Sequence, residues 1–275
     1  MTSFGASDPT LKSAVRSHWE EETCGTRYGN AAERRAWFRE VSAARYGLEP
    51  YIPPFADFPS ARGKDVLEIG VGAGADFENW CAHARHATGV DLTGAAISLT
   101  AERLQIAGVD PSRYTLQRSD AETLPFPDAS FDLVYSWGVL HHTPDTPAAF
   151  REAFRVLRSD GRLRAMIYHV PSWTGLLLAA RHGTLPQRKA IFEHLESAGT
   201  KAYTVSEARA LVESAGFRSV AVSTHLGPGD LLNLKLSAKY DTALGWLTMA
   251  LYPRWLVRLL GHRFGLNLMI EARKP

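Results

Sequence analysis

Cysteine is scarce in this sequence, and so is net charge of either sign. The two cysteines in 275 residues, Cys24 and Cys81, are too few and too far apart for a disulfide framework or a zinc site. We therefore expect no bound metal and a reducing, cytoplasmic location. The formal net charge is only +2, so the composition does not demand a nucleic-acid partner.

A long uninterrupted apolar run is also missing. The most apolar stretch, residues 243–260, contains Pro253, Arg254 and Arg258, which makes it a poor membrane span. We expect it to form an amphipathic helix pair or a lid, without stable insertion into a membrane. The N-terminal stretch "MTSFGASDPTLKSAVRSHWE" lacks the apolar core of a signal peptide.

The first 60 residues differ in pattern from the rest. The stretch "ERRAWFREVSAARYG" carries apolar residues near helical spacing up to Gly47, so we expect a helix there. The proline-rich stretch "EPYIPPFADFPSARG" is typical of a linker. We therefore expect a helical segment with a linker over residues 1–60 and a second unit over residues 61–275.

From residue 61 onward, short apolar strands alternate with helices. The predicted strands are "DVLEIG", "HATGVDL", "RYTLQRSD", "FDLVYSW", "GRLRAMIYHV", "FRSVAVSTH" and "GLNLMIEARKP". Thr93, Gly108 and Pro147 supply start and stop signals for the helices between them. This alternation predicts an α/β fold, a Rossmann-like, seven-stranded, mostly parallel sheet with helices on both faces. Residues 171–204 and 227–263 fall outside it, and we expect either ligand-covering cap insertions or ordinary packing helices.

The stretch "DVLEIGVGAGADF", residues 65–77, places Gly70, Gly72 and Gly74 directly after a strand. Glycines let such a loop bring its backbone close to a nucleotide. Gly70, Gly72 and Ala75, with Asp91 about 20 residues further on, also satisfy the dinucleotide fingerprint. The loop alone leaves two alternatives, a dinucleotide with its pyrophosphate and an adenosyl sulfonium without phosphate.

Three features favour the adenosyl sulfonium. Glu68 lies inside the apolar strand, where a carboxylate is costly unless a polar group satisfies it. Asp120 follows the third strand and is placed to accept a hydrogen bond from an exocyclic amine such as that of adenine. A dehydrogenase also needs a sizeable substrate domain, whereas only the two caps remain in this chain.

Four stretches in this order and spacing carry a family resemblance: "VLEIGVGAGADF", "GVDLT", "SDAETLPFPDASFDLVYSWGVLHHTPD" and "AFREAFRVLRSDGRLRAMIYH". They resemble the class I S-adenosylmethionine-dependent methyltransferases, in the branch that acts on small molecules, most strongly over residues 63–170. The resemblance implies S-adenosylmethionine as cofactor and makes residues 61–275 a methyltransferase domain with caps. Aromatic residues in the caps favour a small lipophilic or aromatic acceptor, methylated at carbon, nitrogen or oxygen.

The resemblance also implies roles for individual residues. The three loop glycines pass close to the cofactor, and Glu68 faces the methionyl ammonium. Asp91 takes both ribose hydroxyls through charge-assisted hydrogen bonds. The other implied contacts are Leu92 against the adenine, Asp120 and the Ala121 N–H on the adenine edge, Ser136 and Trp137 beside the methionyl tail, and Tyr28 with Arg27 near the methionyl carboxylate. Asp91 as a mere helix cap, Asp120 as a turn residue and a surface helix around Tyr28 are the structural alternatives.

Four residues at the rim of the fourth and fifth strands are candidates for catalysis. His141 and His142 follow the fourth strand, and Tyr168 and His169 end the fifth, where the methyl group is expected. Histidine suits proton transfer near neutral pH, and we place His142 first. A base is needed only if the nucleophile arrives protonated. The alternative is that the histidine pair only shapes the cofactor pocket.

Other functions stay open at this point. Nucleic-acid amino-methylating enzymes carry an (Asp/Asn)-Pro-Pro-aromatic tetrad after the fourth strand, where this chain reads "SWGV" and has no basic domain beside it. We therefore expect a small-molecule partner and no nucleic acid. A fold-mate that uses the cofactor structurally, as in a cyclase, and a non-catalytic cofactor-binding protein are the alternatives. The helical segments also offer surfaces for a homo-oligomer.

Overall fold

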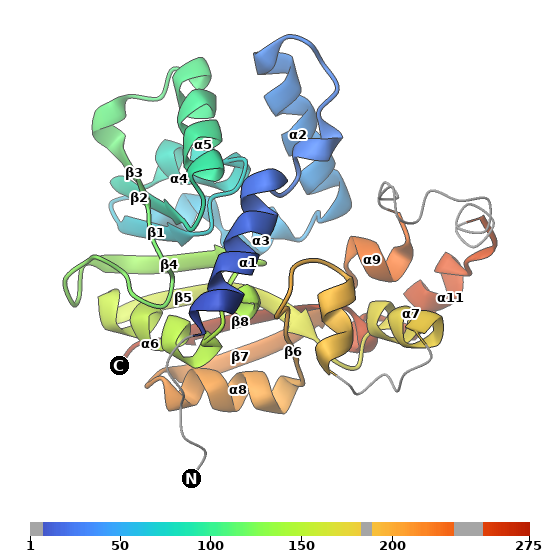
Figure 1. Ribbon diagram of the computed structural model, residues 1–275. Helices are drawn as coiled ribbons and strands as arrows, with labels where there is room; N and C mark the ends of the chain where they lie inside the picture. The colour runs from blue at the N-terminus through green and yellow to red at the C-terminus, as the bar shows by residue number, and fades with distance from the viewer. Residues whose placement is uncertain (1–7, 183–188, 234–249) are drawn as a thin grey trace.

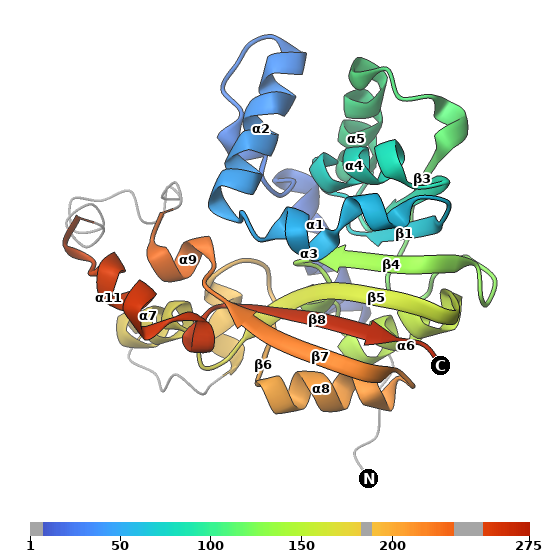
Figure 2. The ribbon, with the colours of Figure 1, turned by 180° about the vertical axis from the view of Figure 1, so that it is seen from behind.

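The computed structural model describes residues 8–182, 189–233 and 250–275, which form one sheet with helices on both sides (Figures 1 and 2). Seven strands follow the order β3-β2-β1-β4-β5-β8-β7, and an eighth, β6, pairs with β5. Strand β8 is antiparallel to β5 and β7, whereas the other pairings are parallel. The strands are β1 (Asp65–Ile69), β2 (His86–Asp91), β3 (Tyr114–Arg118), β4 (Phe131–Trp137), β5 (Leu157–His169), β6 (Ala202–Tyr203), β7 (Arg218–His225) and β8 (Asn267–Arg273). The predicted seven-stranded, mostly parallel sheet is confirmed, and β6 is an addition inside the first predicted cap.

Helices connect the strands and end where the sequence signals predict. The α-helices are α1 (Pro9–Glu21), α2 (Arg34–Leu48), α3 (Ile52–Ala56), α4 (Ala75–His83), α5 (Gly94–Ala107), α6 (Thr146–Val156), α7 (Trp173–His182), α8 (Val205–Ser214), α9 (Pro228–Leu231) and α11 (Arg254–Leu260). The 3-10 helices are η1 (Thr26–Tyr28), η2 (Phe58–Ala61), η3 (Pro111–Arg113), η4 (Leu140–His142), η5 (Lys189–His194) and η6 (His262–Phe264). The Thr93 side chain caps α5, Gly108 ends it in a left-handed conformation, and Pro147 lies in the first turn of α6.

The two faces of the sheet carry two separate apolar cores, because successive strand residues point to opposite sides. Val66 of β1 packs with Phe77 and Trp80 of α4 on one face. Its neighbour Leu67 packs on the other face with Phe150 of α6 and the buried side of α8. Both faces are therefore covered, as a parallel sheet requires.

The proline-rich stretch around residue 55 is not a linker, so that prediction is wrong. It forms α3 and η2, and Ile52 and Phe58 are buried in the core that also contains Trp80. The rings of Phe58 and Trp80 meet edge to face with centroids 4.5 Å apart. Proline tolerates the first turn of a helix, so its frequency there reflects two short helices whose apolar residues fasten the N-terminal segment to the sheet.

The two predicted cap regions lie at one end of the molecule. Helix α7, η5 and β6 belong to the first cap, and α9, α11 and η6 to the second (Figures 1 and 2). Residues 234–249, which include the first part of the predicted amphipathic helix pair, lie outside the described residues. In the part of the chain that the structure describes, no helix is long and apolar enough to cross a bilayer.

Candidate active site

A cavity of about 380 Å³ opens at the carboxyl ends of the central strands. Its walls come from the loops after β1, β2, β3 and β4, from helix α1, and from parts of both caps. The sheet order reverses between β1 and β4, and ligands of open α/β sheets bind at such a switch point. The cavity is therefore where the fold alone predicts a ligand site.

The glycine loop after β1 forms the floor of this cavity. Gly70 has φ +85°, and a Cβ there would lie 2.1 Å from the Cγ2 of Val139. A side chain at residue 70 would thus be strained by its backbone and would collide with the loop after β4. Gly72 has φ +51°, and the nearest atom to a Cβ built there is 4.0 Å away. The absence of a side chain at residue 72 therefore keeps the cavity open.

Glu68 is a buried carboxylate that lacks a partner. It is 4% exposed on β1, and its Oε2 has no hydrogen-bond donor in the described structure. Burial raises the pKa of this carboxyl well above its usual range, and the nearby Asp76 carboxylate adds to the rise. Asp76, in contrast, is satisfied by Arg45 at 3.0 Å and by the Tyr135 hydroxyl at 2.8 Å. Glu68 is the group in this cavity that an incoming donor, best a cation, would complete.

Asp91 ends β2 and holds the glycine loop. Its Oδ2 accepts from the Gly72 N–H at 3.2 Å, and its Oδ1 accepts from the N–H and hydroxyl of Thr93 at 3.0 and 2.8 Å. Burial raises its pKa, and these hydrogen bonds oppose the rise. Asp91 therefore does fasten the start of α5, and it also lines the cavity beside Leu92. A carboxylate has about four acceptor positions, so one remains for a ribose hydroxyl.

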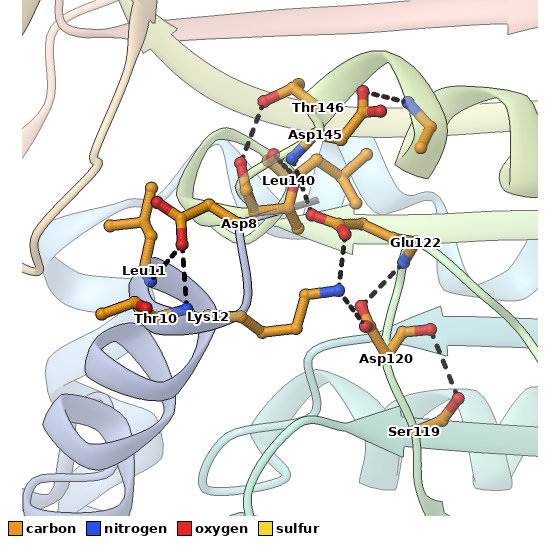
Figure 3. A network of polar contacts seen from close by, with 12 residues as sticks. Asp8, Thr10, Leu11, Lys12, Ser119, Asp120, Glu122, Leu140, Asp145 and Thr146 are labelled. Atoms are coloured by element: carbon orange, nitrogen blue, oxygen red, sulfur yellow. Dashed lines mark hydrogen bonds and ion pairs between the residues drawn. The ribbon is translucent and has the colours of Figure 1, made fainter. Parts of the chain in front are cut away.

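Asp120 meets a residue that the sequence analysis did not single out. The Lys12 ammonium of α1 donates to Asp120 and, at 2.6 Å, to Oε2 of Glu122 (Figure 3). The Glu122 N–H donates to Asp120 Oδ1 at 2.9 Å. Asp120 and Ala121 both line the cavity as predicted, but part of the acceptor capacity of Asp120 is already used by Lys12.

Helix α1 lies across the cavity and is fastened at both ends. Lys12 holds its first turns, and near its other end Glu20 accepts from the N–H groups of Gly94 and Ala95 at 3.1 and 3.0 Å. Those donors belong to the N-terminus of α5, where a carboxylate is favourable. The inner face of α1 and the following turn contribute to the lining with Val15, Trp19, Arg27 and Tyr28. Tyr28 thus lines the cavity, and its proximity to the methionyl carboxylate stays a prediction.

Acidic side chains outnumber permanent cations in the lining of the cavity. Six carboxylates line it: Glu49, Glu68, Asp76, Asp91, Asp120 and Glu196. Three permanent cations face them: Lys12, Arg27 and Arg45. Such a wall favours a cationic ligand with a sulfonium and an ammonium, and it disfavours a pyrophosphate. The unpartnered Glu68 and this charge excess together fit the adenosyl sulfonium.

At the end of β4 the structure separates two neighbours that the sequence analysis grouped. Trp137 lines the cavity. Ser136 is fully buried outside it, and its hydroxyl donates to the Ile69 carbonyl at 3.0 Å. Because strand residues alternate between faces, only one of the two reaches the ligand side. Ser136 ties β4 to β1 instead.

Three of the four catalytic candidates are not suited to take a proton from a ligand. Two lie outside the cavity lining, and the third has a raised pKa. His141 is fully buried behind the cavity lining, with its ring 4.1 Å from that of Tyr168, and burial lowers its pKa well below the usual range. His169 Nδ1 lies 2.9 Å from the Gly265 carbonyl, also outside the lining, and burial lowers its pKa. Tyr168 lines the cavity, but burial and then the charge of Glu196 raise its pKa, so its phenol stays protonated.

His142 lines the cavity and is held by the first cap. Its Nδ1 lies 3.0 Å from the hydroxyls of both Ser197 and Thr200. Its Nε2 lies 3.1 Å from Oε2 of Glu196, an ion-pair distance without the alignment of a hydrogen bond. Burial raises the pKa of Glu196, but the close His142 imidazole and the Tyr168 hydroxyl outweigh it and leave the pKa below its usual range. Glu196 therefore keeps its charge beside the imidazole.

Glu196 was missed because nothing local in "EHLESAGT" marks it, and only the folding of the cap brings it to β4. Among the described residues, donor atoms of His141, His142 and Glu196 lie within 4.8 Å of one another, close enough in principle for a metal ion. That no metal is bound stays a prediction.

Comparison with known proteins finds methyltransferases that are similar to this chain in sequence. Residues 67–165 match the family model described as a methyltransferase domain. The chain is 38% identical over 120 residues to 27-O-demethylrifamycin SV methyltransferase of Amycolatopsis mediterranei, covering 43% of this chain and 44% of that protein. It is 34% identical over 158 residues to the fatty-acid O-methyltransferase of Mycolicibacterium smegmatis, covering 54% of each. The chain thus spans about half the length of these relatives.

The fold is also shared with solved structures. The [4+2]-cyclase SpnF superimposes with a TM-score of 0.57 at 17% identity, over 96% of this chain and 93% of that chain. At this identity the likeness concerns the fold.

Proposed function

Because this chain belongs to the class I S-adenosylmethionine-dependent methyltransferases, with residues 67–165 as the matched domain, we propose that it methylates a small, largely apolar acceptor. The observation that carries the proposal is the buried, unpartnered Oε2 of Glu68 in a cavity lined by six carboxylates. A cationic ligand completes both features, and a pyrophosphate completes neither.

The cavity residues fit the adenosyl cofactor group by group. We assign Glu68 to the methionyl ammonium and the remaining acceptor position of Asp91 to one ribose hydroxyl, not to both. Asp120 and the Ala121 N–H take the adenine edge, with Leu92 against its face. Trp137 borders the methionyl tail, and Tyr28 with Arg27 lies at the cavity mouth under α1.

The cofactor supplies an activated methyl group on a sulfonium, and its leaving group is a neutral thioether. The protein therefore has to align the acceptor and exclude water, and orientation can supply most of the rate. Helix α1 and the first cap both contribute to the cavity wall. If the acceptor arrives protonated, its proton passes to the pair formed by Nε2 of His142 and Oε2 of Glu196, which lie 3.1 Å apart in residues that both line the cavity.

The acceptor side of the cavity supports an apolar substrate. Its lining there includes Trp19, Met166, Tyr168, Leu195 and Leu266, a surface suited to a hydrocarbon or an aromatic ring. The two relatives named above, whose names specify a rifamycin and a fatty acid, agree in substrate class. We extend that class, and not either compound, to this chain.

Incubation with methyl-labelled S-adenosylmethionine and a panel of fatty acids, phenols and polyketides tests the proposal. We expect label in at least one apolar acceptor. Label only in tRNA, DNA or protein would overturn the acceptor class. Tight S-adenosylhomocysteine binding with no transfer to any acceptor would favour the alternative in which the cofactor is structural, as in a cyclase.

A further inference from the structure

Exposed apolar side chains are concentrated in one segment, residues 250–264, which the proposed methyl transfer does not explain. Of the eight large apolar side chains exposed in the described part of the chain, six lie between residues 251 and 264. They are Leu251, Trp255, Leu256, Leu259, Leu260 and Phe264, of which Leu259 is 74% and Trp255 69% exposed. Large apolar side chains that are exposed together in one segment indicate an interaction site.

The same segment is basic and contains no acid. Residues 250–264 include Arg254, Arg258 and Arg263 but neither aspartate nor glutamate. Since the whole chain has a formal net charge of +2, these three arginines leave the rest of the chain at −1. The exposed apolar side chains and the net positive charge of the chain therefore lie in the same segment.

In helix α11 these residues point in different directions around the helix axis. At about 100° per residue, Trp255, Leu256, Leu259 and Leu260 fall on one outward arc. Val257 is 2% exposed and points into the protein. Arg254 and Arg258 lie one turn apart beside that arc. An apolar arc with tryptophan, flanked by arginine, is the pattern of helices that lie in a membrane interface.

The segment is joined to the wall of the cavity. The Tyr252 hydroxyl donates to the Asp230 carbonyl at 2.8 Å, and Arg254 Nη2 donates to the Leu232 carbonyl at 3.0 Å. Both acceptors belong to α9 or its end, and Pro228 and Gly229 of α9 line the cavity. Figures 1 and 2 place α7, α9 and α11 together at one end of the molecule.

We propose that residues 250–264 dock this protein onto the surface of an anionic lipid bilayer. The apolar arc of α11 enters the boundary between headgroups and acyl chains, and the arginines contact the lipid phosphates. A second copy of the chain fits less well, because a two-fold contact through this patch would bring one set of arginines against the other. Docking adds to the proposed function a route by which an apolar acceptor passes from the bilayer to the neighbouring cavity, and that route rests on the proposed function.

Vesicle flotation of the full chain tests the docking without any cofactor or substrate. We expect flotation with phosphatidylcholine vesicles that contain phosphatidylglycerol, and little with phosphatidylcholine alone or at high salt. The double substitution Trp255→Ser/Leu259→Ser should lower the partition coefficient at least about tenfold, since each side chain loses apolar burial. Arg258→Glu/Arg263→Glu should abolish the preference for the anionic lipid.

Two exposed residues outside the patch provide matched controls. Val205→Ser and Arg62→Glu remove an exposed apolar group and an exposed cation elsewhere, and both should float like wild type. Unchanged melting temperature and S-adenosylhomocysteine affinity of the patch variants would separate a docking defect from misfolding or a failed cofactor site. Absence of flotation, flotation that survives both patch variants, or a dimer that Trp255→Ser/Leu259→Ser dissociates would each overturn the proposal.

Discussion

The ammonium of Lys12 bridges the carboxylates of Asp120 and Glu122, more than 100 residues later in the chain (Figure 3). Glu122 is buried and also accepts from the Asp145 N–H at 2.7 Å. The bridge thus fastens α1 to the loop after β3, next to the group assigned to adenine. A ligand in the cavity would lie under helix α1. Release of that ligand requires α1 to move or the side chains of α1 to rotate away.

Removing this bridge should loosen the helix over the cavity. Lys12→Met should speed S-adenosylhomocysteine dissociation about tenfold and lower stability by about 1 kcal/mol, the usual cost of a lost hydrogen-bonded partner. Stopped-flow release and thermal melts measure the two effects. Arg16→Met, at an exposed position of the same helix, is the control and should change neither. An unchanged dissociation rate in Lys12→Met would show that α1 does not retain the ligand.

Glu68 should destabilise the unliganded protein at high pH. Burial raises its folded pKa above that of the unfolded chain, so the native state binds the proton more tightly. Its contribution to stability is therefore complete below the ordinary glutamate range and is lost as pH rises through the raised pKa. Glu68→Gln cannot lose a proton, and above neutral pH its melting temperature should exceed that of wild type by about 2–4 °C.

The same substitution should weaken S-adenosylhomocysteine binding, because the ammonium loses its carboxylate. Melts across pH and calorimetry provide both readings, and the exposed Glu21→Gln is the control. A lower melting temperature for Glu68→Gln at high pH, or unchanged affinity, would contradict the assignment of Glu68.

Glu196 should matter for the rate and not for cofactor affinity. If His142 takes a proton from the acceptor, Glu196→Gln removes the charge that stabilises the imidazolium and should slow single-turnover methylation about 10²-fold. Glu193→Gln, exposed in the same cap, should behave like wild type. A normal rate with a lowered melting temperature would make Glu196 only an anchor of the cap.

No metal should be needed for activity, although His141, His142 and Glu196 lie close together. Glu196 already lies 3.1 Å from Nε2 of His142, and methyl transfer from a sulfonium needs no Lewis acid. Dialysis against a chelator should leave the methylation rate unchanged. A rate that falls with chelation and returns on adding one divalent cation would assign this cluster to a metal.

The local sequence pattern was sufficient to predict part of the site, but it could not predict the rest. Gly70 follows β1, Asp91 ends β2 and Asp120 lies just beyond β3, so the strand pattern predicts their position in the cavity. Lys12 and Glu196 find their partners only through the packing of distant segments, and no local pattern marks either. The linker prediction failed because proline is common both in linkers and in the first turn of short helices.

The central claim, that the cavity holds an adenosyl sulfonium and not a dinucleotide, is tested most directly by calorimetry of the purified chain. We expect S-adenosylhomocysteine to bind in the micromolar range, about −8 kcal/mol, and NAD not to bind measurably. In the same titration, Asp91→Ala should lose about 2–3 kcal/mol of S-adenosylhomocysteine affinity, whereas Thr93→Ala, which removes the cap of α5 and one donor to Asp91 but leaves the carboxylate, should keep most of it. NAD binding tighter than S-adenosylhomocysteine, or full affinity in Asp91→Ala, would contradict the account.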